Sequence, residues 1–167
     1  MTEDNVSRIV RESCRAWPGY EAHSLEVVLR ILRAYHFFDQ ELVRGQVDYE
    51  VSPGEFGVLI ELRLAGPPHK LTPTQLHNRL LVTSGGMTGR IDRLQGRGLV
   101  CRIPDPQDRR SILVELTESG KELIELAGQT HFRIMEHLTV GITSEERECL
   151  ASLLRKLLLN IELSCGK

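Results

Sequence analysis

Arginine recurs at three- and four-residue spacings in the segment 83–98. Placed at about 100° per residue, Arg90, Arg93 and Arg97 fall on one face of a helix. A guanidinium presents its donors in a planar fork that fits a phosphate, or the O6 and N7 acceptors of guanine. This face therefore favours recognition of nucleic acid. The residues leave a plainer interpretation open, in which the helix is amphipathic and its arginines are solvated.

Small and hydroxyl-bearing residues surround the arginines, which would let this helix approach a groove closely. A neighbouring stripe of Met87, Ile91 and Leu94 is apolar and is expected to pack inward. Just upstream, Thr72-Pro-Thr-Gln75 has the pattern of a helix start. The candidate DNA contacts from these two helices are Thr72, Thr74, Gln75, Ser84, Gly85, Gly86, Thr88, Gly89, Arg90, Arg93 and Arg97.

The hydrophobic period then changes from helical to two. Segments 99–103 and 111–116 are predicted strands, and a polar, proline-rich loop joins them. Two strands around a basic loop make a hairpin wing. Arg109 and Arg110 suit the narrow minor groove, where the negative potential is strongest. Asp108 completes the candidate DNA set, although we expect it to be structural, holding Arg110 or the loop backbone.

Further helices must position this DNA-facing unit. Helix-start patterns occur at Ser52-Pro-Gly-Glu55, at Thr117 and at Thr143-Ser-Glu-Glu146. Periodic apolar residues predict long helices over about 21–46 and from Thr143 onward. A third should run over about 118–138 after its cap Thr117, and an extra helix over about 2–15 begins the chain. This order is that of a winged helix-turn-helix between dimerisation helices.

The predicted fold class is mainly α with a small β-hairpin, in which a winged helix-turn-helix lobe joins long N- and C-terminal dimerisation helices. We expect one chain with three regions. The N-terminal extension and first dimerisation helix occupy 1–46, the winged helix-turn-helix 52–116, and the C-terminal dimerisation helices 117–167.

The charge is distributed unevenly along the chain. The net charge is -2, but residues 69–110 hold eight Lys/Arg against three Asp, so that segment carries +5. Phosphate attraction acts locally, so one basic segment on an acidic body is compatible with DNA binding. An uneven solvated surface is the alternative that charge alone leaves open.

Other classes of protein are disfavoured. No apolar run approaches the ~18 residues of a membrane span, and the N-terminus has no secretory signal pattern, so we expect a cytoplasmic protein. The four cysteines are scattered without a C-x-x-C pair, which argues against a zinc site or a disulfide framework. Nucleophile-elbow, Walker and metal-protease patterns are missing, so we expect no catalytic residues, no cofactor and no metal.

Several motifs together resemble the MarR family of bacterial transcriptional regulators. They are L-T-P-T-Q-L (71–76), T-S-G-G-M-T-G-R-I-D-R-L (83–94), G-L-V (98–100), D-P-Q-D-R-R (105–110) and L-T-E-S-G (116–120). The resemblance spans about 25–161. It implies a homodimer with interleaved first and last long helices, bound to a near-palindromic double-stranded operator. It also implies a repressor released by a ligand that binds between the dimerisation helices and the DNA-reading lobe.

The extra N-terminal helix is similar to that of the urate-responsive branch of the family. That resemblance implies a ligand pocket containing Trp17, Arg90 and Arg102, together with an aspartate. The position of the aspartate is occupied here by Gly57, which cannot supply the charge. We therefore expect a small aromatic or anionic ligand in place of urate. Trp17 could alternatively be a core anchor for the extra helix, and Arg90 could contact DNA as well as ligand.

Two alternatives remain at this stage. Cys14 lies on the first helix near Arg11 and Arg15, which would suit a redox-sensing repressor that acts through this thiol. A winged-helix interaction module without a DNA role is also possible, but it would not need Arg109 on the wing.

Overall fold

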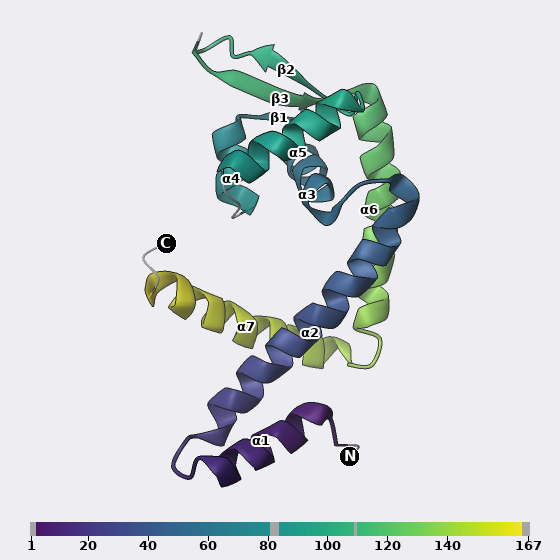
Figure 1. The fold of residues 1–167 in the computed structure, drawn as a ribbon. Helices are drawn as coiled ribbons and strands as arrows, with labels where there is room; N and C mark the ends of the chain where they lie inside the picture. The colour runs from purple at the N-terminus through teal and green to yellow at the C-terminus, as the bar shows by residue number, and fades with distance from the viewer. Residues whose placement is uncertain (1–2, 81–83, 109, 165–167) are drawn as a thin grey trace.

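The computed structural model describes residues 3–80, 84–108 and 110–164, which form a winged lobe above a stalk of long helices (Figure 1). In chain order the elements are α1 (Asn5–Ala16), α2 (Ala22–Gln46), the 3-10 turn η1 (Val47–Tyr49), α3 (Pro53–Leu64), β1 (Lys70–Leu71), α4 (Pro73–Leu80), α5 (Ser84–Gly96), β2 (Val100–Pro104), β3 (Ile112–Leu116), α6 (Glu118–Leu138) and α7 (Ser144–Ser164). The predicted fold class, mainly α with a small sheet, is confirmed. No helix in these described ranges is long and apolar enough to cross a bilayer.

Polar side chains at the helix starts account for most of the boundaries. The Ser52 hydroxyl accepts from the Glu55 amide at 3.3 Å, and the Glu55 carboxylate accepts from the Ser52 amide at 2.8 Å. This is the capping box predicted at the start of α3. The same reciprocal pattern occurs at the other two predicted boxes, between Thr72 and Gln75 and between Thr143 and Glu146.

The core of the winged lobe lies between α3, α4, α5 and the sheet. Met87, Ile91 and Leu94 of α5 are buried, as their spacing predicted. They belong to one cluster with buried residues of the neighbouring elements, among them Leu59, Leu62, Leu76 and Val114. Full burial of such a side chain contributes about 1.5–3 kcal/mol, so this cluster fixes α5 in the lobe.

The sheet has three antiparallel strands in the order β1-β3-β2. Arg102 of β2 and Leu71 of β1 both lie opposite Val114, which makes β3 the central strand. The sequence predicted only the β2–β3 hairpin, so the prediction was incomplete because it lacked β1. β1 comprises two residues, Lys70 and Leu71, and a pair is too short to show an alternating pattern.

The stalk consists of α2 and α6 side by side, with α1 against the end of α2 far from the lobe (Figure 1). Arg30 of α2 binds the carboxylate of Asp4 at 3.0 Å, and Val6 and Val10 of α1 are buried. The first helix begins at Asn5, three residues later than predicted, because the Asp4 carboxylate accepts from the Ser7 amide and caps the helix there. Thr2 lies outside the described residues.

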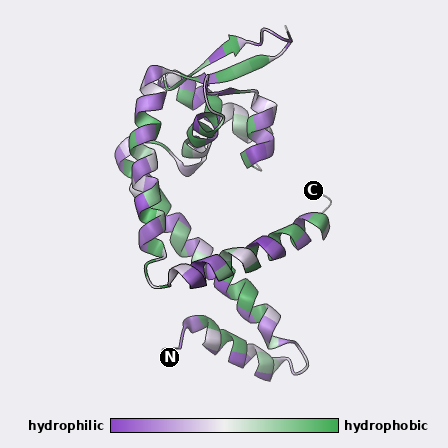
Figure 2. Ribbon diagram, turned by 180° about the vertical axis from the view of Figure 1, so that it is seen from behind, coloured by the Kyte–Doolittle hydropathy of each residue, from purple (hydrophilic) through white to green (hydrophobic). Residues whose placement is uncertain are grey.

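Apolar surface remains uncovered on the stalk. α7 buries none of its residues, and Figure 2 shows both hydrophobic and hydrophilic positions along it where it extends sideways from α2 and α6. Exposed large apolar side chains on α2 and α7 include Val28, Leu32, Tyr35, Leu150, Leu153, Leu158 and Ile161. The predicted apolar stripes of the two helices are thus real, but a single chain does not bury them.

Candidate DNA-binding surface and ligand pocket

α5 presents a buried face to the lobe and a polar face to solvent. The exposed positions include Gly85, Gly86 and Thr88, while the side chain of Ser84 lies outside the description and Gly89 is half-buried. The Arg93 side chain is 60% exposed. Small residues beside an exposed arginine leave this face open to close approach by a duplex.

Arg93 is held by a buried carboxylate. Its Nε donates to Oε1 of Glu55 at 2.6 Å, and Glu55 is only 6% exposed. Burial raises the pKa of the Glu55 carboxyl. Hydrogen bonds from Ser52 and Arg93, with the charge of Arg93, outweigh that effect and hold the pKa below its usual value. The pair is therefore ionised at neutral pH, with the two Nη atoms of Arg93 not used in this contact.

The other two arginines of the predicted face have different neighbours. Arg90 lies over Gly54 at the start of α3, where a Cβ would sit 2.5 Å from the arginine Nε. Arg97 donates to the backbone oxygens of Glu50 at 2.5 Å and of Tyr49 at 3.2 Å. Arg97 therefore anchors the turn η1, whereas the sequence had grouped it with the DNA-facing arginines.

α4 contributes a second polar edge beside α5. Thr72 and Gln75 use their side chains to cap α4, and Thr74 is exposed. A cleft of about 370 Å³ separates the two helices and is lined by Pro73, Thr74, His77, Asn78, Met87 and Thr88. Candidate residues of both helices thus share one surface of the lobe.

The wing loop is ordered by its aspartates. Asp108 Oδ1 accepts from the Arg110 amide at 3.0 Å, and Asp105 Oδ1 accepts from the Gln107 amide at 2.9 Å. Asp108 therefore holds the loop backbone, as expected. Arg110 is exposed, and Arg109 lies outside the described residues.

The four predicted ligand residues do not form one pocket within a chain. Arg102 pairs with Asp92 at 2.6 Å, which links β2 to α5, and Gly57 packs against Leu80 inside the lobe. Trp17 ends α1 at the far end of the stalk (Figure 1). Within one chain Trp17 therefore lies far from Arg90 and Arg102, because α1 contacts α2 (Figure 1), and their grouping in one ligand site stays a prediction.

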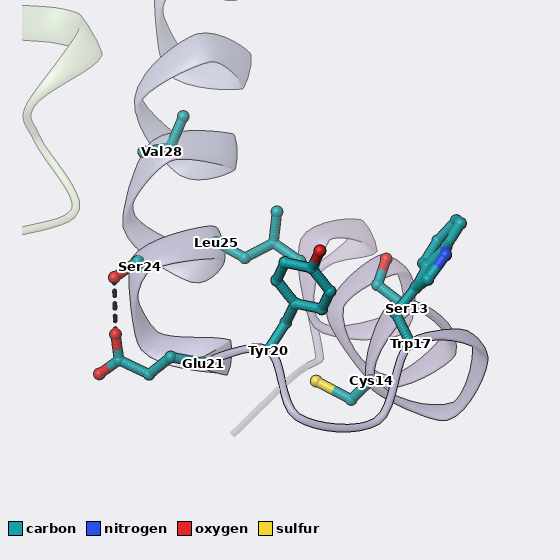
Figure 3. Close-up of a pocket in the computed structure, with 8 residues that line it drawn as sticks. All are labelled: Ser13, Cys14, Trp17, Tyr20, Glu21, Ser24, Leu25 and Val28. Carbon is teal, nitrogen blue, oxygen red and sulfur yellow. Dashed lines mark hydrogen bonds between the residues drawn. The ribbon is translucent and has the colours of Figure 1, made fainter.

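A pocket does exist beside Trp17. It has a volume of about 530 Å³ and lies between the end of α1 and the start of α2 (Figure 3). Trp17 is 63% and Tyr20 80% exposed, so neither ring is a core anchor in the single chain. The sequence did not predict the remaining lining residues, which are Ser13, Cys14, Tyr20, Glu21, Ser24, Leu25 and Val28. A second aromatic residue after Pro18-Gly19 was the available signal.

Cys14 belongs to this pocket wall and is half-buried. Its predicted neighbour Arg11 pairs with the carboxylate of Glu3. Cys14, Cys101 and Cys149 are free thiols, whereas Cys165 lies outside the described residues. Within the described ranges, no group of three or more His, Cys, Asp and Glu is arranged to hold a metal ion.

Comparison with known proteins identifies the family. A model described as MarR family matches residues 49–111, from η1 to the wing. The regulator PecS of Dickeya dadantii is 30% identical over 149 residues, which cover 89% of this chain and 90% of PecS. The chain belongs to the MarR family. Since its curated relatives are transcriptional regulators, this MarR-family chain is a regulator and not an enzyme.

Two solved structures of regulators share this fold. A cysteine-to-serine variant of Escherichia coli MarR in complex with operator DNA has a TM-score of 0.72 and 31% identity, covering 79% of this chain and 93% of that one. BpsR of Bordetella bronchiseptica, whose DNA binding is regulated by 6-hydroxynicotinic acid, has a TM-score of 0.70 and 28% identity, covering 79% of this chain and 98% of that one. Resemblance to the urate-responsive branch stays a prediction.

Proposed function

We propose that this MarR-family regulator is a homodimeric repressor that binds a near-palindromic operator and is released by a small aromatic ligand. The observation that carries the DNA-binding part is the surface of α5. Its inner face is buried in the lobe core, its outer face combines Arg93 with small residues, and a basic wing follows directly in the chain.

In the proposed complex α5 enters the major groove and the wing follows the adjacent minor groove. Arg90 and Arg93 contact base edges or phosphates, with Thr74, Gly85, Gly86, Thr88 and Gly89 nearby. Arg109 and Arg110 of the wing contribute mainly charge. A well-formed bidentate contact between arginine and guanine discriminates against other bases by about 1–3 kcal/mol.

A second copy of the chain is the proposed partner of the uncovered stalk. The regions 1–46 and 117–167 would supply the dimer interface, and 52–116 the DNA-reading lobe. Large apolar side chains on α2 and α7 are exposed in the single chain, and association of two copies would bury them. A twofold dimer presents two α5 helices to half-sites about 34 Å apart, one turn of DNA.

The proposed ligand site is the pocket beside Trp17. The rings of Trp17 and Tyr20 offer stacking surfaces, and Leu25 and Val28 add apolar wall, which suits a planar aromatic compound (Figure 3). Glu21 is the one charged side chain among the described lining residues. The geometry therefore supports an aromatic ligand better than a strongly anionic one.

A continuous set of contacts connects this pocket with the DNA surface. α2 runs from the pocket to η1, where Arg97, the residue that follows α5, donates to the carbonyls of Tyr49 and Glu50. A ligand that shifted α2 would thus act through η1 on Arg97, which follows α5 in the chain. Such coupling between sites is typically about 1–3 kcal/mol.

Redox sensing through Cys14 is the second candidate, because the thiol is part of the same pocket wall. Oxidation there would add a polar group beside Trp17 and could act through the same route. Unchanged operator affinity after mild peroxide treatment would exclude it.

The proposed function is tested by titrating the purified protein against the DNA upstream of its own gene. The titration is run at two salt concentrations, with and without a set of aromatic acids that includes 6-hydroxynicotinate and urate. We expect tight, salt-sensitive binding that one aromatic compound relieves in the wild type but less in Trp17→Ala. Equal loss of DNA binding and ligand response in that variant would instead assign Trp17 a folding role.

A further inference from the structure

Two arginines of α5 meet the first turn of α3. Arg93 binds Glu55, and the guanidinium of Arg90 occupies the space that a side chain at Gly54 would fill. Glu55 is buried, Gly54 is half-buried beneath Arg90, and neither is a candidate DNA contact. They can nevertheless determine where the arginines point.

The two oxygens of Glu55 have separate partners. Oε2 accepts from the amide and the hydroxyl of Ser52, both at 2.8 Å, and so completes the cap of α3. Oε1 accepts from Nε of Arg93. A helix start carries partial positive charge, which disfavours nearby arginines, and the Glu55 carboxylate offsets it.

The hydrogen bond from Nε to Glu55 limits the ways in which Arg93 can bind DNA. An arginine can bind a guanine or a phosphate side-on through Nε and Nη2, or end-on through its two Nη atoms. With Nε bound to Glu55, the end-on mode remains, along a direction fixed by a buried residue. Part of the charge of Arg93 is also compensated, which weakens its attraction to phosphates that carry no sequence information.

We propose that Gly54 and Glu55 are positioning residues that set the sequence preference of α5, by aiming Arg90 and Arg93 without touching DNA. This inference rests on the proposed function, since it requires that α5 reads DNA. It predicts that a substitution in the first turn of α3 lowers the ratio of operator affinity to non-specific affinity while the chain still folds.

The first variant is Glu55→Gln, because glutamine also serves as the third residue of a capping box and preserves the cap. The matched control is Glu50→Gln. Glu50 also faces an arginine, with its Oε2 3.9 Å from Nη2 of Arg97 just after α5, but its side chain is 87% exposed. The two substitutions change the net charge equally.

The experiment measures the Kd of each protein for the operator and for a scrambled duplex at two salt concentrations. For Glu55→Gln we expect non-specific affinity to rise, the log–log salt slope to steepen by about 0.9, as for one more phosphate contact, and the operator-to-scrambled ratio to fall at least fivefold. For Glu50→Gln the ratio should stay within twofold of wild type. Equal ratios in the two variants would overturn the inference.

The second variant, Gly54→Ala, covers the case in which Glu55→Gln is poorly folded. A new Cβ meets only the flexible end of Arg90, so the chain can fold and the guanidinium must move. We expect a melting temperature at or above that of wild type and an operator affinity about tenfold lower. Wild-type operator affinity in this variant would contradict the role of Gly54. A wild-type protein that did not distinguish operator from scrambled DNA would refute the proposed function itself.

Discussion

The guanidinium of Arg93 meets a carboxylate, that of Arg97 meets two backbone oxygens, and Arg90 lies over a glycine. Their common helical spacing predicted a shared face, and Arg93 is indeed exposed beside small residues. The sequence could not assign their partners, because these come from η1 and α3, more than 30 positions earlier in the chain. The chemistry of each arginine is therefore a tertiary property.

His131 predicts a pH dependence of stability. It lies on α6 with its ring 4.8 Å from that of Phe56, and burial lowers the pKa of the imidazole below its ordinary 6.5. The unfolded chain then binds the proton more readily than the folded one. The contribution of His131 to the free energy of unfolding is therefore fully present above about pH 6.5, and it is lost as the pH falls from there toward the pKa of the folded state. The melting temperature should decrease between pH 7 and 5 less steeply in His131→Leu than in wild type. Parallel pH curves for the two proteins would refute this assignment.

At the scale of elements, local sequence determined most boundaries. The boxes at Ser52, Thr72 and Thr143 begin their helices as predicted, since a capping box needs only residues within one turn. β1 was missed because its pairing with β3 joins segments about 45 residues apart. The docking of α1 was missed for the same reason, because it depends on contacts with α2 such as that between Asp4 and Arg30.

Gly120 marks the tightest junction between elements. A Cβ there would lie 2.0 Å from the carbonyl oxygen of Leu99, and backbone cannot move aside as a flexible side chain can. Gly120→Ala should therefore destabilise the protein by about 1–3 kcal/mol, as overpacking does. Gly128→Ala on the same helix is the control, since nothing lies within 4 Å of its Cβ position and alanine gains up to about 1 kcal/mol in helix propensity. Chemical denaturation should give a free energy of unfolding below that of wild type for Gly120→Ala and at or above it for Gly128→Ala. The same change in both variants would contradict the close packing at Gly120.

At the scale of the whole molecule, the described residues form a buried core in the lobe and long helices with uncovered apolar faces. The sequence predicted both stalk stripes from their periodicity, and it predicted a ligand pocket from family resemblance. It could not show that Trp17 is separated from Arg90 and Arg102, because distances along a 25-residue helix depend on how α1 docks.

The uncovered faces predict a dimer that depends on α7. Leu153 is 62% exposed in the single chain, and a glutamate there would have to be buried without a partner in the dimer. Leu153→Glu should lower the mass measured by sedimentation equilibrium from twice 18.9 kDa toward the monomer. Lys156→Glu, at a position of the same helix that is already charged and so adds no new buried charge, should remain dimeric. A monomeric wild type would contradict the proposed assembly.

The central claim, that α5 reads the operator while the wing supplies charge, is tested most directly by comparing Arg93→Ala with Arg109→Ala. The measurement is the Kd of each variant for operator and scrambled DNA at two salt concentrations. We expect Arg93→Ala to lose about 1–3 kcal/mol of operator binding and little non-specific binding. We expect Arg109→Ala to weaken both and to reduce the salt slope by about one phosphate contact. The opposite ranking, or variants that bind both duplexes like wild type, would contradict the account.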